Sequence, residues 1–112
     1  MSKEIVWLGR SLADLLKFPE GARREAGQKL RRVQDGLEPT DYRPMRDVGP
    51  GVIEIRIHIG GEYRLFYVAR HAEAIFVLHV FEKKARKTAQ HDISVGRQRF
   101  REMMRWLRDR ER

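Results

Sequence analysis

The chain has 112 residues, a net charge of +8 and no cysteine. That length is common for one domain, and we expect a single domain over residues 1–112. The lack of cysteine excludes disulfide frameworks, thiolate metal sites and cysteine nucleophiles. The longest apolar run, Ala74 to Leu78, is far shorter than the roughly 20 residues that span a bilayer. The apolar stretch Ile5 to Leu8 is too short for a secretory signal, so we expect a soluble, cytoplasmic protein.

The excess positive charge is concentrated in the last quarter of the chain. Residues 83–112 carry 11 basic and 4 acidic side chains, whereas residues 1–82 carry 13 basic and 12 acidic ones. Clustered cations attract polyanions, of which nucleic acid is the commonest partner. A solvated helix, or a surface that binds an acidic protein, would have the same composition. The charge pattern therefore favours a nucleic-acid partner without specifying it.

The N-terminal third predicts a strand followed by a helical hairpin. Residues 3–8 are rich in β-forming side chains. Ser11 is a candidate N-cap for a short helix. Three leucines share one face of that helix: Leu12, Leu15 and Leu16. Small and apolar residues then recur at helical spacing between Pro19 and Gly36, which predicts a second helix bounded by these two residues.

The rest of the chain predicts three strands and a final helix. Residues 37–47 are expected to be mostly irregular, with a short strand near Met45, and Gly49-Pro50-Gly51 is expected to be a turn. Strands are predicted over residues 52–59, 63–70 and 74–81. A helix is predicted from about His91 to Arg108, and its apolar stripe consists of Ile93, Phe100, Met104 and Leu107. The order of elements predicts an α+β fold, with an antiparallel β-sheet, an N-terminal helical hairpin and a C-terminal helix, the helices packed on one face of the sheet.

The register of the central hairpin determines where its charges lie. A two-residue Gly60-Gly61 turn would pair Ile57 with Arg64 and place a charge among isoleucines. A three-residue loop instead pairs His58 with Arg64, and Ile59 with Tyr63. This second register gathers polar side chains on the sheet face away from the isoleucines: Glu54, Arg56, His58 and Arg64. An ordinary solvated face with cross-strand ion pairs would have the same pattern.

Three short segments occur in a characteristic order along the chain. They are Glu54-Ile55-Arg56, then Glu62-Tyr63-Arg64-Leu65-Phe66-Tyr67, and finally Phe81-Glu82-Lys83-Lys84-Ala85-Arg86-Lys87-Thr88 before the last helix. In this order, and with these surrounding elements, the chain resembles the RelE/ParE toxin superfamily over nearly its whole length. Within that superfamily it is most similar to the HigB-like, phage-derived branch. The resemblance implies a RelE-like fold and the toxin of a type II toxin–antitoxin system.

The resemblance also implies an activity and a set of partners. Many members are endoribonucleases (mRNA interferases) that cleave mRNA on the ribosome, by attack of a ribose 2′-hydroxyl on the adjacent phosphate. They need no metal and no small-molecule cofactor, bind a cognate antitoxin protein, and have no membrane partner. A ParE-like inhibitor of DNA gyrase, which cleaves nothing, is the alternative, and an inactive prophage remnant is a third possibility. The basic run Lys83–Lys87 favours the nuclease, because an inhibitor needs no phosphate pocket.

Candidate site residues follow by matching this chain to the family motifs. Arg64 matches the arginine that holds the scissile phosphate, while Lys84 and Arg86 match basic positions that stabilise charge in the transition state. Such cations lower the barrier to phosphoryl transfer, and the planar guanidinium suits phosphate well. Further contacts to RNA phosphates are assigned to four residues: Arg56, His58, Lys83 and Lys87.

The acid–base residue is where the chain departs from its relatives. Several relatives have a tyrosine at the start of the last helix, whereas this chain reads Thr88-Ala89-Gln90-His91. His91 is the nearest replacement, because histidine titrates near neutral pH and can stack on a base. His58 is the other candidate, whereas His79 lies in an apolar strand and is expected to be a hydrogen-bonded core residue. The histidines lack metal-ligand spacing, so no metal site is expected.

Overall fold

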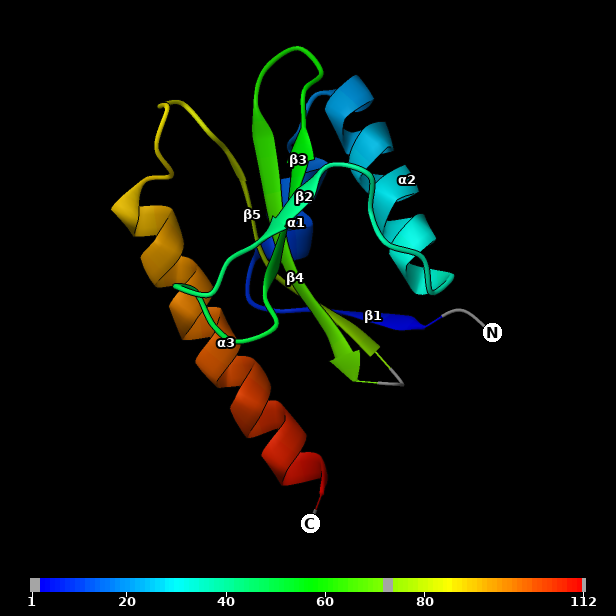
Figure 1. Ribbon diagram of the computed structural model, residues 1–112, viewed down its shortest axis with the longest axis vertical. Helices are drawn as coiled ribbons and strands as arrows, with labels where there is room; N and C mark the ends of the chain where they lie inside the picture. Colours follow the sequence, from blue (N-terminus) through cyan, green and yellow to red (C-terminus); the bar gives the residue numbers. More distant parts are fainter. Residues whose placement is uncertain (1–2, 72–73, 112) are drawn as a thin grey trace.

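The computed structural model describes residues 3–71 and 74–111, and its elements form three layers, with the sheet between α2 and α3 (Figure 1). In chain order the elements are β1 (Glu4–Trp7), α1 (Ser11–Leu16), α2 (Glu20–Gln34), β2 (Tyr42–Pro44), β3 (Ile53–Ile57), β4 (Tyr63–His71), β5 (Ala74–Glu82) and α3 (Gln90–Arg110). The predicted α+β class, with an N-terminal helical hairpin and a C-terminal helix, is confirmed.

The sheet has five strands in the order β1-β5-β4-β3-β2. The pairs formed by β2, β3, β4 and β5 are antiparallel, but β1 pairs with β5 in parallel. The sheet is therefore mixed, and the prediction of a fully antiparallel sheet is wrong at this edge. A tight turn would force an antiparallel pair, but β1 is connected to β5 only through the rest of the chain, so either direction was open to it.

Helices cover both faces of the sheet, which corrects the expectation that they pack on one face. Along β5 every residue from Ala74 to Phe81 is buried. Ile75 and Val77 belong to the core beneath α2, whereas Phe76 and Leu78 belong to the core beneath α3. A strand buried on both faces has a continuous apolar run rather than an alternating one.

In the helical hairpin, the predicted C-terminal end of α2 is confirmed, but the predicted N-cap of α1 is wrong. α2 ends in a Schellman motif, in which Gly36, with φ of +83°, donates to the Val33 carbonyl and Leu37 donates to that of Arg32. Ser11 is the first residue of α1 and not its N-cap, because its buried hydroxyl donates to the Val77 carbonyl at 3.2 Å. Of the three leucines on α1, only Leu15 is buried, since so short a helix turns little of its surface to the sheet.

α3 begins at Gln90 and approaches the sheet closely at a glycine. A Cβ atom on Gly96 would lie 2.9 Å from Val48 Cγ1 and 3.0 Å from a ring carbon of Phe66. Because glycine has no Cβ atom, the backbone of α3 can pack closely against Val48 and Phe66 at this position. Of the predicted apolar stripe, Ile93, Phe100 and Leu107 pack on the core, but Met104 is 50% exposed and its neighbour Met103 is buried instead.

Candidate nucleic-acid site

The β3–β4 register places the predicted charges on the predicted face, but through a longer loop. Arg56 pairs with Arg64, and the loop covers residues 58–62. The predicted pairing of His58 with Arg64, and of the residues beside them, is therefore wrong by two positions. A shift of two keeps every side chain on its face, because side chains alternate with a period of two. His58 moves out of the strand and into the loop.

Glu54 is the buried centre of this polar face. Its side chain is 1% exposed, and three arginine Nε atoms surround its Oε1: Arg43 at 3.1 Å, Arg56 at 3.5 Å and Arg64 at 3.9 Å. Like charges opposite each other in a sheet repel, and the Glu54 carboxylate offsets that repulsion between Arg56 and Arg64. The alternative of an ordinary solvated face does not hold at Glu54 and Arg64, since both are buried.

Arg64 is held on several sides by groups of this same chain. Its side chain is 6% exposed, Nη1 donates to the Tyr63 carbonyl at 2.9 Å, and Nη2 donates to Glu62 Oε1 at 3.0 Å. Its Nε faces Glu54 without a hydrogen-bond partner in the described part of the chain. The guanidinium is thus fixed in orientation, and part of its binding edge is occupied by a carboxylate.

His58 lies in the loop between two carboxylates. Its Nδ1 is 2.8 Å from both carboxylate oxygens of Glu62, and its Nε2 is 2.7 Å from Asp41 Oδ2. The hydrogen bond to Glu62, followed by the one to Asp41, raises the pKa of His58 above its usual value. The hydrogen bonds from His58 and then Arg64 lower the pKa of Glu62. With an acceptor at each ring nitrogen, the imidazolium form is favoured.

The predicted basic residues after β5 form a loop, which we call the basic loop (residues 83–89). It lies at the same end of the sheet as the β3–β4 loop (Figure 1), and the Lys83 backbone N–H donates to the Glu62 carbonyl at 2.7 Å. Its other three cations are exposed: Lys84, Arg86 and Lys87. Within residues 3–71 and 74–111, no hydrogen bond or ion pair engages these three side chains.

His91 is not brought into contact with Arg64. It is the second residue of α3, its side chain is exposed, and no hydrogen bond links it to another group in the parts of the chain that the structure describes. The structure therefore brings Arg56, His58 and Arg64 together around shared carboxylates. It places the basic loop beside them and His91 at the far end of that loop.

His79 is a core residue, as predicted. It is 8% exposed, its Nε2 is 2.8 Å from Asp92 Oδ1, and its ring stacks on Phe81 with centroids 4.8 Å apart. Burial lowers the pKa of His79, although the hydrogen bond to Asp92 opposes this effect. Because Asp92 lies in the first turn of α3, this contact ties the start of the helix to β5.

Sequence reasoning missed two site residues in this part of the chain: Arg43, which lies in β2, and Asp41, which comes just before it. Asp41 and Arg43 lie in the segment that was expected to be mostly irregular, yet the pairing of Arg43 with Glu54 brings them beside the site. Arg56 Nη1 is 3.9 Å from Asp41 Oδ1, which closes the cluster on that side. The available signal was the alternation of Asp41 and Arg43, which has the same period as the alternation of Glu54 and Arg56.

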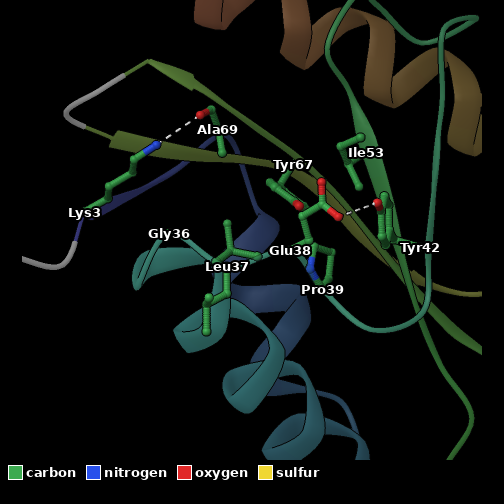
Figure 2. A pocket seen from close by; sticks show the side chains of 10 residues that line it. Lys3, Gly36, Leu37, Glu38, Pro39, Tyr42, Ile53, Tyr67 and Ala69 are labelled. Carbon is green, nitrogen blue, oxygen red and sulfur yellow. Dashed lines mark hydrogen bonds between the residues drawn. The ribbon is translucent and has the colours of Figure 1, made fainter.

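A separate hollow lies on the other face of the sheet, beneath the end of α2 (Figure 2). It has a volume of about 220 Å³, and burial raises the pKa of Tyr67 in its wall to about 12. Two of its other polar groups are already bonded: the Tyr42 hydroxyl donates to Glu38 at 3.0 Å, and Lys3 donates to the Ala69 carbonyl at 3.1 Å. None of the predicted site residues lines it.

Comparisons with known proteins agree with the fold and with the motifs. A family model described as phage-derived protein Gp49-like (DUF891) matches residues 13–101. Among solved structures, a double arginine-to-alanine mutant of the E. coli toxin RelE, in the free state, is similar with a TM-score of 0.59 and 22% identity, covering 84% of this chain and 97% of that chain. A search of curated proteins found no match.

The hydropathy of the helices and the extent of the family match complete the description. No helix among the described residues is long and apolar enough to cross a membrane. The family match spans most of the chain and includes all three motif segments, so the resemblance inferred from the sequence is confirmed. The chain belongs to the Gp49-like family of phage-derived proteins, and its fold is that of the RelE toxins.

Proposed function

We propose that this protein is the toxin of a type II toxin–antitoxin system, an endoribonuclease that cleaves mRNA on the ribosome, with a cognate antitoxin protein as its partner. Family membership and the RelE-like fold support this proposal. The observation that carries it is the junction of two loops at Glu62 and Lys83, where the oriented arginine Arg64 lies beside a loop with three exposed cations.

In the proposed reaction the ribose 2′-oxygen attacks the adjacent phosphorus and the bond to the 5′-oxygen breaks. The products are a 2′,3′-cyclic phosphate and a 5′-hydroxyl. Negative charge grows on the non-bridging oxygens, and fixed cations stabilise it. Arg64 is suited to this role because the Tyr63 carbonyl and Glu54 already orient its guanidinium.

The remaining cations divide between the reaction and the RNA backbone. Lys84 and Arg86 are proposed to stabilise the transition state, since no group in the described chain neutralises them. Arg56, Lys83 and Lys87 are proposed to contact neighbouring phosphates. We propose no metal in this reaction, because the cations of the chain can take up the charge that a metal ion would otherwise stabilise.

Two histidines are proposed for the proton transfers. The 2′-hydroxyl must lose a proton as it attacks, and the departing 5′-oxygen must gain one. His91 is proposed as the base, since its ring is free to approach a ribose. His58 is proposed as the acid, because its contacts with Glu62 and Asp41 favour the imidazolium form, which has a proton to give.

The decisive experiment maps mRNA 5′ ends by primer extension after brief induction in a bacterial host. We expect new ends within coding regions, reduced at least 100-fold by Arg64→Lys, in line with the loss of a preorganised charge-stabilising group. Lysine keeps a positive charge beside Glu54, which protects the fold. Arg43→Lys is the matched control, because Arg43 also binds Glu54 but lies on β2.

Three results would contradict parts of the proposal. Undiminished cleavage by Arg64→Lys would remove Arg64 from the site. Growth arrest without new 5′ ends would point to a target other than mRNA, such as DNA gyrase. Cleavage of naked RNA at the same positions, and with the same efficiency, as translated mRNA would refute the role of the ribosome.

A further inference from the structure

The carboxylate of Glu62 lies between the side chains of Arg64 and His58 at the β3–β4 loop. Glu62 Oε1 accepts a hydrogen bond from Arg64 Nη2 at 3.0 Å and lies 2.8 Å from His58 Nδ1. Glu62 Oε2 is also 2.8 Å from the same imidazole nitrogen. A single anion thus contacts a guanidinium on one side and an imidazole on the other, which is the arrangement expected around a phosphate oxygen pair.

We propose that Glu62 is an internal anion that occupies the phosphate-binding site formed by Arg64 and His58, and that a phosphodiester of the RNA displaces it. The identity of the ligand rests on the proposed function. Carboxylate and phosphate both offer two oxygens to a guanidinium, so one can stand in place of the other. The Glu62 carboxylate therefore competes with RNA for the phosphate-binding site.

Glu62 and Glu54 differ in their freedom to move. The Glu54 side chain is 1% exposed and is surrounded by three arginines, whereas the Glu62 side chain is 45% exposed. The backbone carbonyl of Glu62 accepts the hydrogen bond from Lys83, so its position does not depend on the carboxylate. The Glu62 side chain can rotate into solvent without moving the loop, which is what displacement by RNA requires.

The site would keep its shape after Glu62 leaves. The Asp41 carboxylate, 2.7 Å from Nε2, continues to hold the imidazole of His58. The Tyr63 carbonyl and Glu54 continue to hold the guanidinium of Arg64. Departure of Glu62 would therefore expose two oriented donors and raise the positive charge where the phosphate is to bind.

The test compares two variants that remove the same charge at the same end of the sheet. Glu62→Gln removes the competing anion. Glu82→Gln is the control, because Glu82 is exposed at the end of β5 and its side chain makes no hydrogen bond or ion pair in the described chain. Affinity is measured by fluorescence anisotropy with a fully 2′-O-methylated single-stranded RNA, which cannot be cleaved, and by NMR with inorganic phosphate.

We expect Glu62→Gln to bind the RNA about tenfold more tightly than the unsubstituted protein, as loss of one charge-assisted competitor implies. Glu82→Gln should gain no more than about twofold, through long-range electrostatics alone. In the phosphate titration, the ring resonances of His58 should shift at lower phosphate concentration in Glu62→Gln. Both glutamates are at least partly exposed, so glutamine should be accommodated, and thermal unfolding will confirm it.

The outcomes separate this inference from the proposed function. Equal gains in both variants, or weaker binding by Glu62→Gln, would overturn the internal-anion model even if the protein cleaves mRNA. Tighter phosphate binding by Glu62→Gln alone would support the model even if no mRNA cleavage is found, in which case the nuclease proposal would fail while the anion site remained.

Discussion

The arginines around Glu54 and the cations of the basic loop contribute similar positive charge to the sequence. In the fold, the first are paired with carboxylates and the second are exposed to solvent. Around Glu54, Arg43 and Arg64 each face a carboxylate at 3.1–3.9 Å. In the basic loop, Lys84 and Arg86 are exposed, and no ion pair engages either side chain among the described residues. The three arginines of the first region face three carboxylates, since Asp41 and Glu62 lie beside them together with Glu54, whereas the second region keeps its full charge.

This difference shows that the net charge counted from a sequence can exceed the charge that remains free to attract a polyanion. A paired arginine contributes orientation, because its carboxylate fixes the guanidinium, while an unpaired lysine contributes attraction that reaches roughly one Debye length, about 8 Å at physiological ionic strength. A nuclease needs both properties at one place. Here the bond between the Glu62 carbonyl and the Lys83 N–H brings the two regions together.

The largest expected effect is on stability and should be confined to the paired region. Glu54→Ala leaves several arginines without their shared anion, and we expect the free energy of unfolding to fall by about 3 kcal/mol. Lys84→Ala should change it by less than about 0.5 kcal/mol, since an exposed, unpaired side chain is lost. Urea denaturation measures both. A loss below about 1 kcal/mol for Glu54→Ala would show that the cluster is effectively solvated.

An intermediate effect is expected on the salt dependence of RNA binding and should be confined to the basic loop. Removing one cation that contacts a phosphate should reduce the slope of log K against log salt concentration by about 0.7 for a single strand. We expect this for Lys84→Ala but not for Arg43→Ala, because the Arg43 guanidinium is already paired with the Glu54 carboxylate at 3.1 Å. Equal changes in slope would mean that pairing does not limit the charge available to RNA.

The smallest expected effect is a difference in pKa between two histidines, one beside exposed carboxylates and one in the core. His58, between two exposed carboxylates, should titrate above its usual pKa of 6.5, and the buried His79 below it. His58 therefore stabilises the fold below pH 6.5, and this contribution is lost as the pH rises through its raised pKa. The contribution of His79 is present above pH 6.5 and is lost as the pH falls through its lowered pKa.

An NMR titration of the carbon-bound ring protons measures both pKa values in one experiment. The signals missing from His58→Gln belong to His58, and through-bond assignment identifies those of His79 among the other three histidines. Asp41→Asn should lower the pKa of His58 without moving that of His79. A His58 that titrates at or below 6.5 would mean that its contacts with Glu62 and Asp41 do not persist in solution.

Local features of the fold could be predicted because neighbouring residues determine them. The end of α2 at Gly36 follows from a positive φ that glycine adopts readily. The common face of Glu54, Arg56 and Arg64 follows from the period of two along a strand, which is why it survived an error of two residues in the register. The burial of His79 follows from its place between apolar residues.

Features that depend on distant segments could not be predicted in this way. The exact register depended on the length of the β3–β4 loop. The sequence around Gly60 and Gly61 is compatible with a two-residue turn, a three-residue turn and the longer loop that the structure has. The role of Glu54 depended on Arg43, which belongs to a strand of three residues, too short for the alternation of Asp41 and Arg43 to identify it by itself. The burial of both faces depended on where α3 packs, although the apolar run of β5 was a signal for it.

The order of the elements other than β2, the family and the set of cations could all be predicted from the sequence, since composition, periodicity and short motifs are properties of the chain. Only the tertiary structure decided which of those cations are paired. Pairing requires carboxylates from other strands and loops, such as Glu54 beside Arg43 and Glu62 beside His58, and their approach depends on register and packing. For this reason the charges that remain free for a polyanion are a property of the fold.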